Sequence, residues 1–183
     1  MQNQSSNSIR TVALVGHGAA GKTTLAESLL AATGTITSRG TVEKGNTTCD
    51  FDPLEKEVGH SLQSAIVSMQ WGGVTLHLID TPGYPDFAGP AIAALAGVDT
   101  ALIVVNAQTG IELCTERMFQ SAGERGLCRM IVINKIDADN TDLPALVNQI
   151  RDRFGKQCML LDLPAHHGQE VVELLGHHEG DSD

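Results

Sequence analysis

The chain has 183 residues, which is enough for one compact domain with a substantial hydrophobic core. Its 22 acidic and 12 basic residues give a formal net charge of −10, which argues against a freestanding nucleic-acid binder and against sequence-specific DNA binding. The four scattered cysteines form no C-x-x-C pair, so neither a zinc site nor a disulfide framework is indicated.

The first eight residues, MQNQSSNS, are polar and lack the basic start and apolar core of a signal peptide. No apolar stretch of the sequence is long enough to span a bilayer. We therefore expect a cytoplasmic protein without a membrane partner, with a disordered segment over residues 1–8.

Five short apolar runs alternate with helix-like segments along the chain. Continuous apolarity is typical of strands buried on both faces, and interleaved helices imply right-handed crossovers. This pattern predicts an α/β fold with a mainly parallel sheet and helices on both faces. The runs are TVALVG (11–16), VTLHLID (74–80), ALIVVNA (101–107), RMIVIN (129–134) and CMLLDLP (158–164), and the predicted helices cover 22–32, 88–96, 111–125, 143–154 and 169–175.

Three segments depart from this alternation. The stretch SAIVSMQWGGVTLHLID (64–80) predicts a hairpin that turns at its Gly-Gly pair, and its first strand is expected to form an antiparallel edge. The segment 34–61 has little periodicity, and loops of that length are usually functional or mobile. The acidic tail, 165–183, is expected to be disordered or the start of an insert, and we interpret its histidine pairs at 166–167 and 177–178 as incidental rather than metal-binding.

The stretch GHGAAGKT (16–23) matches G-x-x-x-x-G-K-[ST], and it follows a predicted strand and opens a predicted helix. Its glycines allow backbone N–H groups to point at phosphates, the lysine reaches the terminal phosphates, and the threonine hydroxyl suits Mg²⁺. The alternative is a Gly-rich turn that contains a lysine. The predicted nucleotide-binding residues of this loop are Gly16, His17, Gly18, Ala19, Ala20, Gly21, Lys22, Thr23 and Thr24.

The stretch NKID follows the later strand RMIVI and predicts the choice of base. The carboxylate of Asp137 can accept from the ring N–H and the exocyclic amine of guanine, whereas adenine offers no such pair of donors. Asn134 and Lys135 are expected to complete the base site. An ordinary strand-end turn is the alternative for this stretch alone. In a chain that also has a phosphate loop, the NKID stretch favours GTP or GDP over ATP and disfavours a P-loop ATPase or kinase.

The stretch DTPG follows the strand VTLHLI at the end of the sheet where nucleotides bind. Asp80 is placed to hold Mg²⁺ directly or through water, and Gly83 lets its backbone N–H approach the terminal phosphate. Thr81 and Pro82 complete this predicted part of the nucleotide site. The alternative is a Pro-Gly turn without a ligand.

With these motifs, the chain resembles the G domain of translational GTPases, and most of all the elongation factor G-like paralogues. The resemblance rests on GHGAAGKTT, TVEKGNTTCDFDPLEKEVGHSL, DTPGYPDF, NKID and CMLLDLP, and covers residues 9–164. It implies the P-loop NTPase G-domain fold, a monomer with the ribosome as partner, and Mg²⁺-dependent hydrolysis of GTP in which Lys22 and Gly83 act at the terminal phosphate. The alternative function is a GTP-loaded regulatory or docking module with little or no hydrolysis.

Four features depart from the family's pattern. Ala19 stands where the family usually has Asp, and Ser61 stands where a threonine usually binds the metal. Ser61 can still supply a hydroxyl to Mg²⁺, and a solvated loop serine is the alternative. Tyr84 replaces the usual histidine; its phenol can position water although it is a poor general base, and packing alone is the other interpretation. No Ser-Ala motif follows NKID, so we expect a G domain that lacks its last strand and binds nucleotide more weakly.

Overall fold

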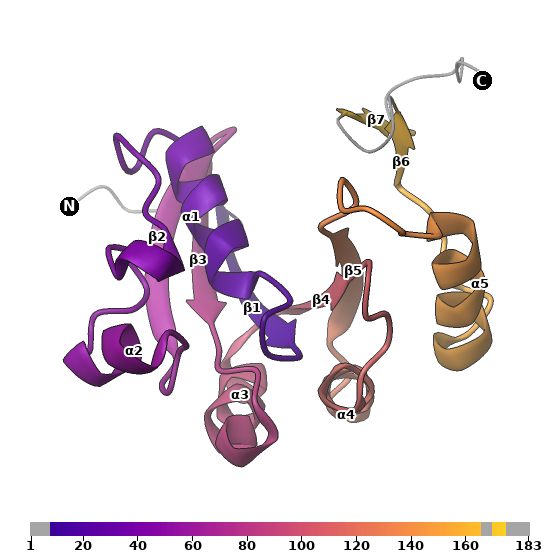
Figure 1. Cartoon of the computed structure of the whole chain (residues 1–183), viewed down its shortest axis with the longest axis horizontal. Helices are drawn as coiled ribbons and strands as arrows, with labels where there is room; N and C mark the ends of the chain where they lie inside the picture. The colour runs from indigo at the N-terminus through magenta and orange to yellow at the C-terminus, as the bar shows by residue number, and fades with distance from the viewer. Residues whose placement is uncertain (1–7, 166–169, 175–183) are drawn as a thin grey trace.

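The computed structural model describes residues 8–165 and 170–174 of the chain. Its main sheet has five strands in the order β2-β3-β1-β4-β5, and every neighbouring pair except β2 and β3 is parallel (Figure 1). This arrangement confirms the predicted α/β fold. The strands are β1 (Ile9–Gly16), β2 (Ala65–Trp71), β3 (Val74–Asp80), β4 (Thr100–Asn106) and β5 (Cys128–Asn134).

The antiparallel edge strand is β2, as the hairpin pattern predicted. Trp71 pairs with Val74, so only two residues, Gly72 and Gly73, form the turn. Both have positive φ angles, 55° and 81°, which two-residue turns of the type that matches strand twist require. Glycine adopts these angles without steric cost, so the Gly-Gly pair fixes the register of the hairpin.

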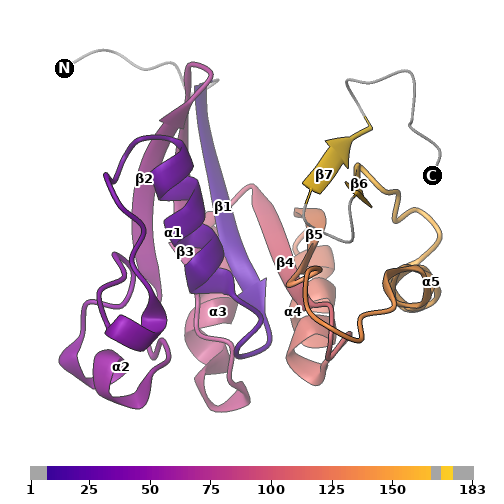
Figure 2. The same cartoon turned by 45° about the horizontal axis from the view of Figure 1, so that its top comes forward.

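Helices cover both faces of the sheet, and successive side chains of its central strands point into two different hydrophobic cores. On one face, Leu14 of β1 packs with Leu30 of α1 (Lys22–Ala32). On the other, the next residue, Val15, packs with α3 (Ala88–Ala94) and α4 (Leu113–Glu124). Figure 2 shows α1 on one side of the sheet and α3 and α4 on the other. Burial on both faces explains why these strands are continuously apolar.

Helix α5 (Leu143–Phe154) has one apolar face, formed by Leu146, Ile150 and Phe154 at helical spacing. All three side chains are buried in the same core as α4. The ring of Phe154 stacks on Phe119 of α4 with 4.1 Å between centroids. This contact packs α5 against α4. The NKID motif covers the last residue of β5 and the first three residues of the loop between β5 and α5.

The 34–61 segment contains two short helices that its lack of periodicity did not predict, the 3-10 helix η2 (Val42–Lys44) and α2 (Pro53–Val58). Helix α2 begins at Asp52, whose side chain accepts from the Leu54 amide, and the Glu55 side chain accepts from the Asp52 amide. Proline at the first helical position completes this start signal. Six residues are too few to show a helical repeat, so only the capping residues carried the information.

A buried carboxylate of α1 holds the same segment against the domain. Glu27 is only 1% exposed, and its side chain accepts hydrogen bonds from the amides of Gly40 (2.9 Å) and Thr48. Charge-assisted bonds to backbone amides are stronger than neutral ones and satisfy the buried charge without a basic partner. The path of residues 40–48 is therefore fixed from α1.

Two predictions for the C-terminal part of the described chain are wrong. Only the end of the run 158–164 is a strand, β6 (Asp162–Ala165), and it pairs with β7 (Glu170–Glu173) rather than joining the main sheet. The helix predicted over 169–175 is therefore replaced by β7. A local antiparallel pair needs only a short connection, whereas a parallel strand needs a crossover of a dozen or more residues.

The remaining predictions for the termini lie outside the described residues. These are residues 1–7 of the N-terminal segment and the histidine pairs at 166–167 and 177–178. Across the residues that the structure describes, no helix combines the length and the apolarity needed to cross a membrane.

Truncation of Phe154, which stacks on Phe119 of α4, tests how α5 packs against the domain. Phe154 is 8% exposed, and Phe154→Ala is expected to lower the free energy of unfolding by about 3 kcal/mol, because it leaves a cavity beside Phe119. Urea unfolding followed by circular dichroism measures the change. As a control, Met159→Ala at a side chain that is 81% exposed should change stability by no more than about 0.5 kcal/mol. Equal effects of the two substitutions would contradict the packing described.

Candidate functional site

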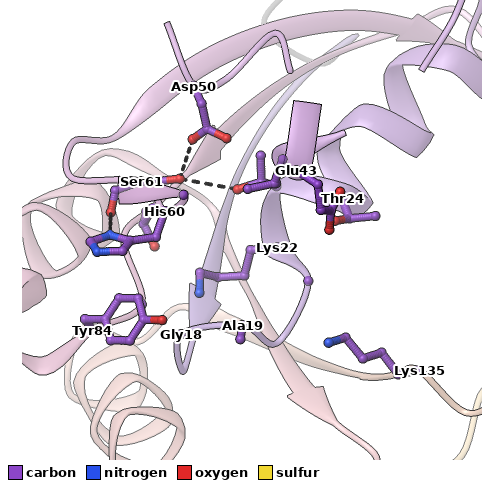
Figure 3. Close-up of a pocket in the computed structure, with 16 residues that line it drawn as sticks. Gly18, Ala19, Lys22, Thr24, Glu43, Asp50, His60, Ser61, Tyr84 and Lys135 are labelled. Atoms are coloured by element: carbon purple, nitrogen blue, oxygen red, sulfur yellow. Dashed lines mark hydrogen bonds between the residues drawn. The ribbon is translucent and has the colours of Figure 1, made fainter. Parts of the chain in front are cut away.

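The loops that follow β1, β3 and β5 meet the 34–61 segment around one cavity of about 410 Å³. Carboxyl ends of parallel strands lie at the same edge of a sheet, so this is where the fold brings the three sequence motifs together. Figure 3 shows the side chains that point into the cavity. The lining residues are Gly18, Ala19, Gly21, Lys22, Thr23, Thr24, Val42, Glu43, Asp50, Gly59, His60, Ser61, Thr81, Gly83, Tyr84 and Lys135.

The loop Gly16–Thr23 curls tightly between β1 and α1. Gly16, Ala19 and Gly21 have φ angles of 138°, 57° and 93°, all in the region that L side chains rarely adopt. A Cβ at Gly21 would collide with the side-chain amide of Asn134, and one at Gly16 would collide with the carbonyl of Val104. Glycine is thus required at positions 16 and 21 both by the positive φ angle and by the lack of room for a Cβ atom. Ala19 bears a strained angle that glycine would adopt freely.

Lys22 is the first residue of α1 and lies at the floor of the cavity. Its side chain is 6% exposed and donates hydrogen bonds to the carbonyls of Gly16 (3.2 Å) and His17 (2.7 Å). Burial lowers the pKa of Lys22, and the nearby Asp80 carboxylate opposes that change. The ammonium group lies at the N-terminus of α1, so positive charge and helix dipole act at the same place.

A chain of hydrogen bonds joins Asp80 to Asp50 through two hydroxyl groups. The Thr23 hydroxyl donates to Asp80 (2.6 Å), and the Ser61 hydroxyl donates to Asp50 (2.7 Å). The two hydroxyl oxygens lie 3.3 Å apart. Either hydroxyl can be the donor across this distance, so the contact between Thr23 and Ser61 links the two carboxylates. Ser61 therefore lies beside Thr23, with its hydroxyl bonded to Asp50.

These oxygens form a donor set suited to a hard divalent cation such as Mg²⁺. Asp80 is 1% exposed, and its Oδ1 atom is buried without a hydrogen-bond partner. Burial raises the pKa of Asp80 to about 6; the Thr23 hydroxyl and Lys22 oppose this, and Asp50 adds to it. A cation would satisfy the orphaned oxygen and the charge. Two of the oxygens in this set belong to hydroxyl groups. Clusters made of three His, Cys, Asp or Glu side chains arranged for a metal are absent within residues 8–165 and 170–174.

The NKID loop is tied to the phosphate loop by Asn134. Its side-chain amide donates to the carbonyl of Ala20 (2.9 Å), so this residue braces the two loops. Lys135 adopts a positive φ angle of 60° and lines the cavity. Asp137 is exposed and lies outside the cavity lining. Lys135 therefore faces the cavity, Asn134 faces the phosphate loop, and the carboxylate of Asp137 faces solvent.

Gly83 and Tyr84 close the opposite end of the cavity. A Cβ at Gly83 would collide with the ammonium of Lys22 and would lie 2.6 Å from the amide nitrogen of Gly18. Only glycine allows the DTPG backbone to approach this closely. Tyr84 is 37% exposed, and Figure 3 shows its hydroxyl end directed toward Gly18.

The other predicted residues lie around the cavity, and two of them, Thr24 and Thr81, belong to its lining. Nε2 of His17 lies 2.9 Å from Oε2 of Glu112, within hydrogen-bonding distance, and Ala20 and Pro82 are buried. The Thr81 hydroxyl donates to the carbonyl of Leu14 (2.6 Å), which fixes the DTPG turn to β1. Thr24 lines the cavity next to Thr23.

Sequence reasoning missed Asp50, Gly59 and His60 as cavity residues, together with Val42 and Glu43. All five belong to the 34–61 segment, whose path depends on hydrogen bonds to α1 that no sequence motif indicates. The signal for Asp50 was the capping sequence DFDPLE, since a helix start two residues later fixes the direction of the chain. No sequence signal identified His60.

Residues 7–177 match the family described as the elongation factor Tu GTP binding domain. The chain belongs to this family. The resemblance to translational GTPases and the predicted G-domain fold are thereby confirmed.

Individual proteins similar to this GTP binding domain include an elongation factor G-like protein of Mycobacterium tuberculosis, 37% identical over 91% of this chain and 23% of that protein. The mitochondrial ribosome-releasing factor 2 of Yarrowia lipolytica is 35% identical over 85% of this chain and 20% of that protein. A crystal structure from Thermus thermophilus has a TM-score of 0.84 at 41% identity, covering 90% of this chain and 24% of that one. The chain spans about a quarter of the length of these proteins.

The buried charge of Asp80 predicts an unusual pH dependence. Because the pKa in the folded chain is raised to about 6, the stability that this group contributes is fully present below its unfolded value, about 3.8, and is lost as the pH rises through 6. Without metal and nucleotide, Asp80→Asn should thus stabilise the chain at pH 7.5, by up to about 3 kcal/mol, and by about half as much at pH 5.

Urea unfolding in EDTA at the two pH values measures this difference. Asp152→Asn, at an exposed position of α5, is the matched control and should change stability little at either pH. An Asp80→Asn effect of the same size at pH 5 and pH 7.5 would refute the assignment.

Proposed function

We propose that this chain binds GTP and hydrolyses it with Mg²⁺, as the nucleotide domain of an elongation factor G-like translation factor. The observation that carries the proposal is the cavity at the carboxyl ends of β1, β3 and β5, lined by residues of the GKT, DTPG and NKID loops together. A pocket lined by a buried lysine and hydroxyl oxygens, with the orphaned carboxylate oxygen of Asp80 next to Thr23, is suited to a phosphate chain and its cation.

Hydrolysis would depend mainly on positioning and charge stabilisation, as in other phosphoryl transfers. Lys22 and the backbone amides of its loop would bind the phosphates and stabilise the charge that develops as water attacks the γ-phosphorus and GDP leaves. The amide of Gly83 would contact the terminal phosphate, and the Tyr84 hydroxyl would orient the attacking water. Gly83 supports this role because it lies against Lys22 with no space for a side chain.

Mg²⁺ would be held by Thr23, Ser61 and Asp80, with Asp50 bonded to the Ser61 hydroxyl. When bound, it supplies neutralising positive charge beside the phosphate oxygens. The four side chains come from the start of α1, the end of β3 and the 34–61 segment, so their joint arrangement depends on that segment lying against the phosphate loop.

The base would be read by the NKID loop. Lys135 lines the cavity, and its aliphatic stem would lie over the ring of guanine. Asp137 is exposed in the described structure and would accept from the guanine edge. Asn134 would act through the phosphate loop, since its amide donates to Ala20.

The proposed partner is the ribosome, and the proposed setting is the cytoplasm, with the chain as a monomer. Support comes from the names of the similar proteins, an elongation factor G-like protein and a ribosome-releasing factor. The net charge of −10 favours a partner bound through local contacts rather than through a general attraction to RNA phosphates.

A docking module with little hydrolysis is the second candidate. It is favoured by Tyr84, because a phenol is a weak base at neutral pH, and by Ala19, which brings no carboxylate to the phosphate loop. The two candidates share the nucleotide site and differ only in turnover.

Equilibrium titration with fluorescent GDP and GTP tests nucleotide binding. Lys22→Ala should weaken binding at least about 100-fold, because removing one member of a buried charged contact costs several kcal/mol. Lys156→Ala, at an exposed lysine after α5 and outside the cavity lining, is the matched control and should bind as the parent does. Unchanged affinity in Lys22→Ala, or tighter binding of ATP than GTP by the parent, would reject the proposal.

The same titration tests the base site. Asp137→Asn replaces an acceptor by an amide whose NH₂ group can donate to the 2-carbonyl of xanthine but cannot accept two guanine donors. We expect a loss of GDP affinity together with a gain for xanthosine diphosphate. A loss for both nucleotides would mean that Asp137 has only a structural role.

Single-turnover hydrolysis, with and without ribosomes, separates the enzyme from the module. If the Tyr84 hydroxyl orients water, ribosome-stimulated hydrolysis should fall roughly 10-fold in Tyr84→Phe, the value of one hydrogen bond. GDP affinity should stay the same, since the ring is retained. Absence of any stimulation in the parent chain would favour the module.

A further inference from the structure

Tyr84 is held between two residues that the motifs did not pair with it. Its ring lies 4.6 Å from the ring of His60, centroid to centroid, at an interplanar angle of 54°. Tilted aromatic pairs at this distance attract each other beyond their buried area. Figure 3 shows His60 next to Tyr84 at the end of the cavity away from Lys135.

Gly18 provides the other side of this enclosure. A Cβ at position 18 would lie 2.8 Å from Cζ of Tyr84, the carbon that carries the hydroxyl. Gly18 does not have a positive φ angle, so the backbone conformation does not require glycine here. The missing side chain therefore serves the close approach of the phenol to the phosphate loop.

His60 is itself fixed by its neighbours. Its Nδ1 atom lies 3.4 Å from the carbonyl of Ser61, where only the ring N–H can donate, and its ring lies 6.0 Å from that of Phe87. The Ser61 hydroxyl belongs to the oxygen set beside Thr23. The imidazole thus joins the loop that contains Ser61 to the loop that contains Tyr84.

We propose that His60 is a positioning residue for hydrolysis, which holds the Tyr84 phenol on Gly18 with its hydroxyl toward the terminal-phosphate end of the cavity. The inference rests on the proposed nucleotide function. His60 does not touch the reacting atoms; it limits the rotamers of Tyr84 and makes the order of residues 59–61 depend on the order of the DTPGY turn. Removal of the ring would free Tyr84 and lower turnover about 2- to 12-fold, the value of an aromatic pair.

The sequence offers a direct probe because Tyr84 is the single tyrosine of the chain. Labelling with 3-fluorotyrosine should give one ¹⁹F resonance, whose shift reports the rings around Tyr84. In the nucleotide-free chain, His60→Ala should move it toward the value of free fluorotyrosine, and His60→Phe should restore most of the shift. His77→Ala, at a histidine bonded to Ser68 on the sheet, is the matched control and should leave it unmoved.

Gly18→Ala approaches the same contact from the other side, because its methyl group would displace the phenol. It should move the resonance while His60 remains intact. If His60→Ala and Gly18→Ala both leave the resonance in place, the enclosure does not exist and the inference is wrong. A His60→Phe resonance that coincides with that of His60→Ala would also overturn it, since ring packing is then not what holds Tyr84.

Turnover completes the test. Ribosome-stimulated hydrolysis should fall in His60→Ala and recover in His60→Phe, with GDP affinity close to that of the parent in both. Equal rates in the parent and His60→Ala would reject the positioning role. Failure of the parent to bind GDP would instead reject the proposed function, and the ¹⁹F comparison in the nucleotide-free chain would still decide whether His60 holds Tyr84.

Discussion

The site depends on the parallel pairing of β1 with β3 and β4, and of β4 with β5. This pairing puts three strand ends at one edge of the sheet, and therefore three loops around one cavity. The hydrogen bond from Asn134 to the Ala20 carbonyl then locks the outermost of these loops to the phosphate loop. Without parallel pairing, the GKT, DTPG and NKID sequences would lie on different sides of the molecule.

Buried negative charge organises the half of the cavity that the sheet does not provide. Glu27, Asp50 and Glu55 are each at most 3% exposed, and all three accept hydrogen bonds from amides or hydroxyls. Burial, with the nearby charges of Asp80 and these carboxylates, raises the pKa of the Cys49 thiol among them. Carboxylates in this setting cost desolvation energy, which their amide bonds offset and which a bound cation would offset further.

The parts of the structure that the sequence predicted are those with a local cause. Helix α1 begins at Lys22 as predicted because the loop motif ends there, and the hairpin turns where two glycines supply positive φ angles. Helix α2 was missed because six residues carry no repeat. His60 and Asp50 were missed because their place beside Tyr84 and Ser61 follows from the tertiary path of the 34–61 segment. The same limit applies to β6. The apolar residues that precede it in the run 158–164 resemble a buried strand, but the strand forms only over Asp162–Ala165.

The way in which Glu27 holds the 34–61 segment also determines which changes of amino-acid sequence this segment tolerates. Its carboxylate bonds to main-chain amides of Gly40 and Thr48, which every residue except proline provides. An exposed side chain between these points, such as that of Lys44, can therefore change while the contour of the loop persists, whereas Thr47 is buried and bonded to Asp50. A single inserted or deleted residue between the two anchor points would be tolerated far less, since it would carry one amide out of reach of the carboxylate.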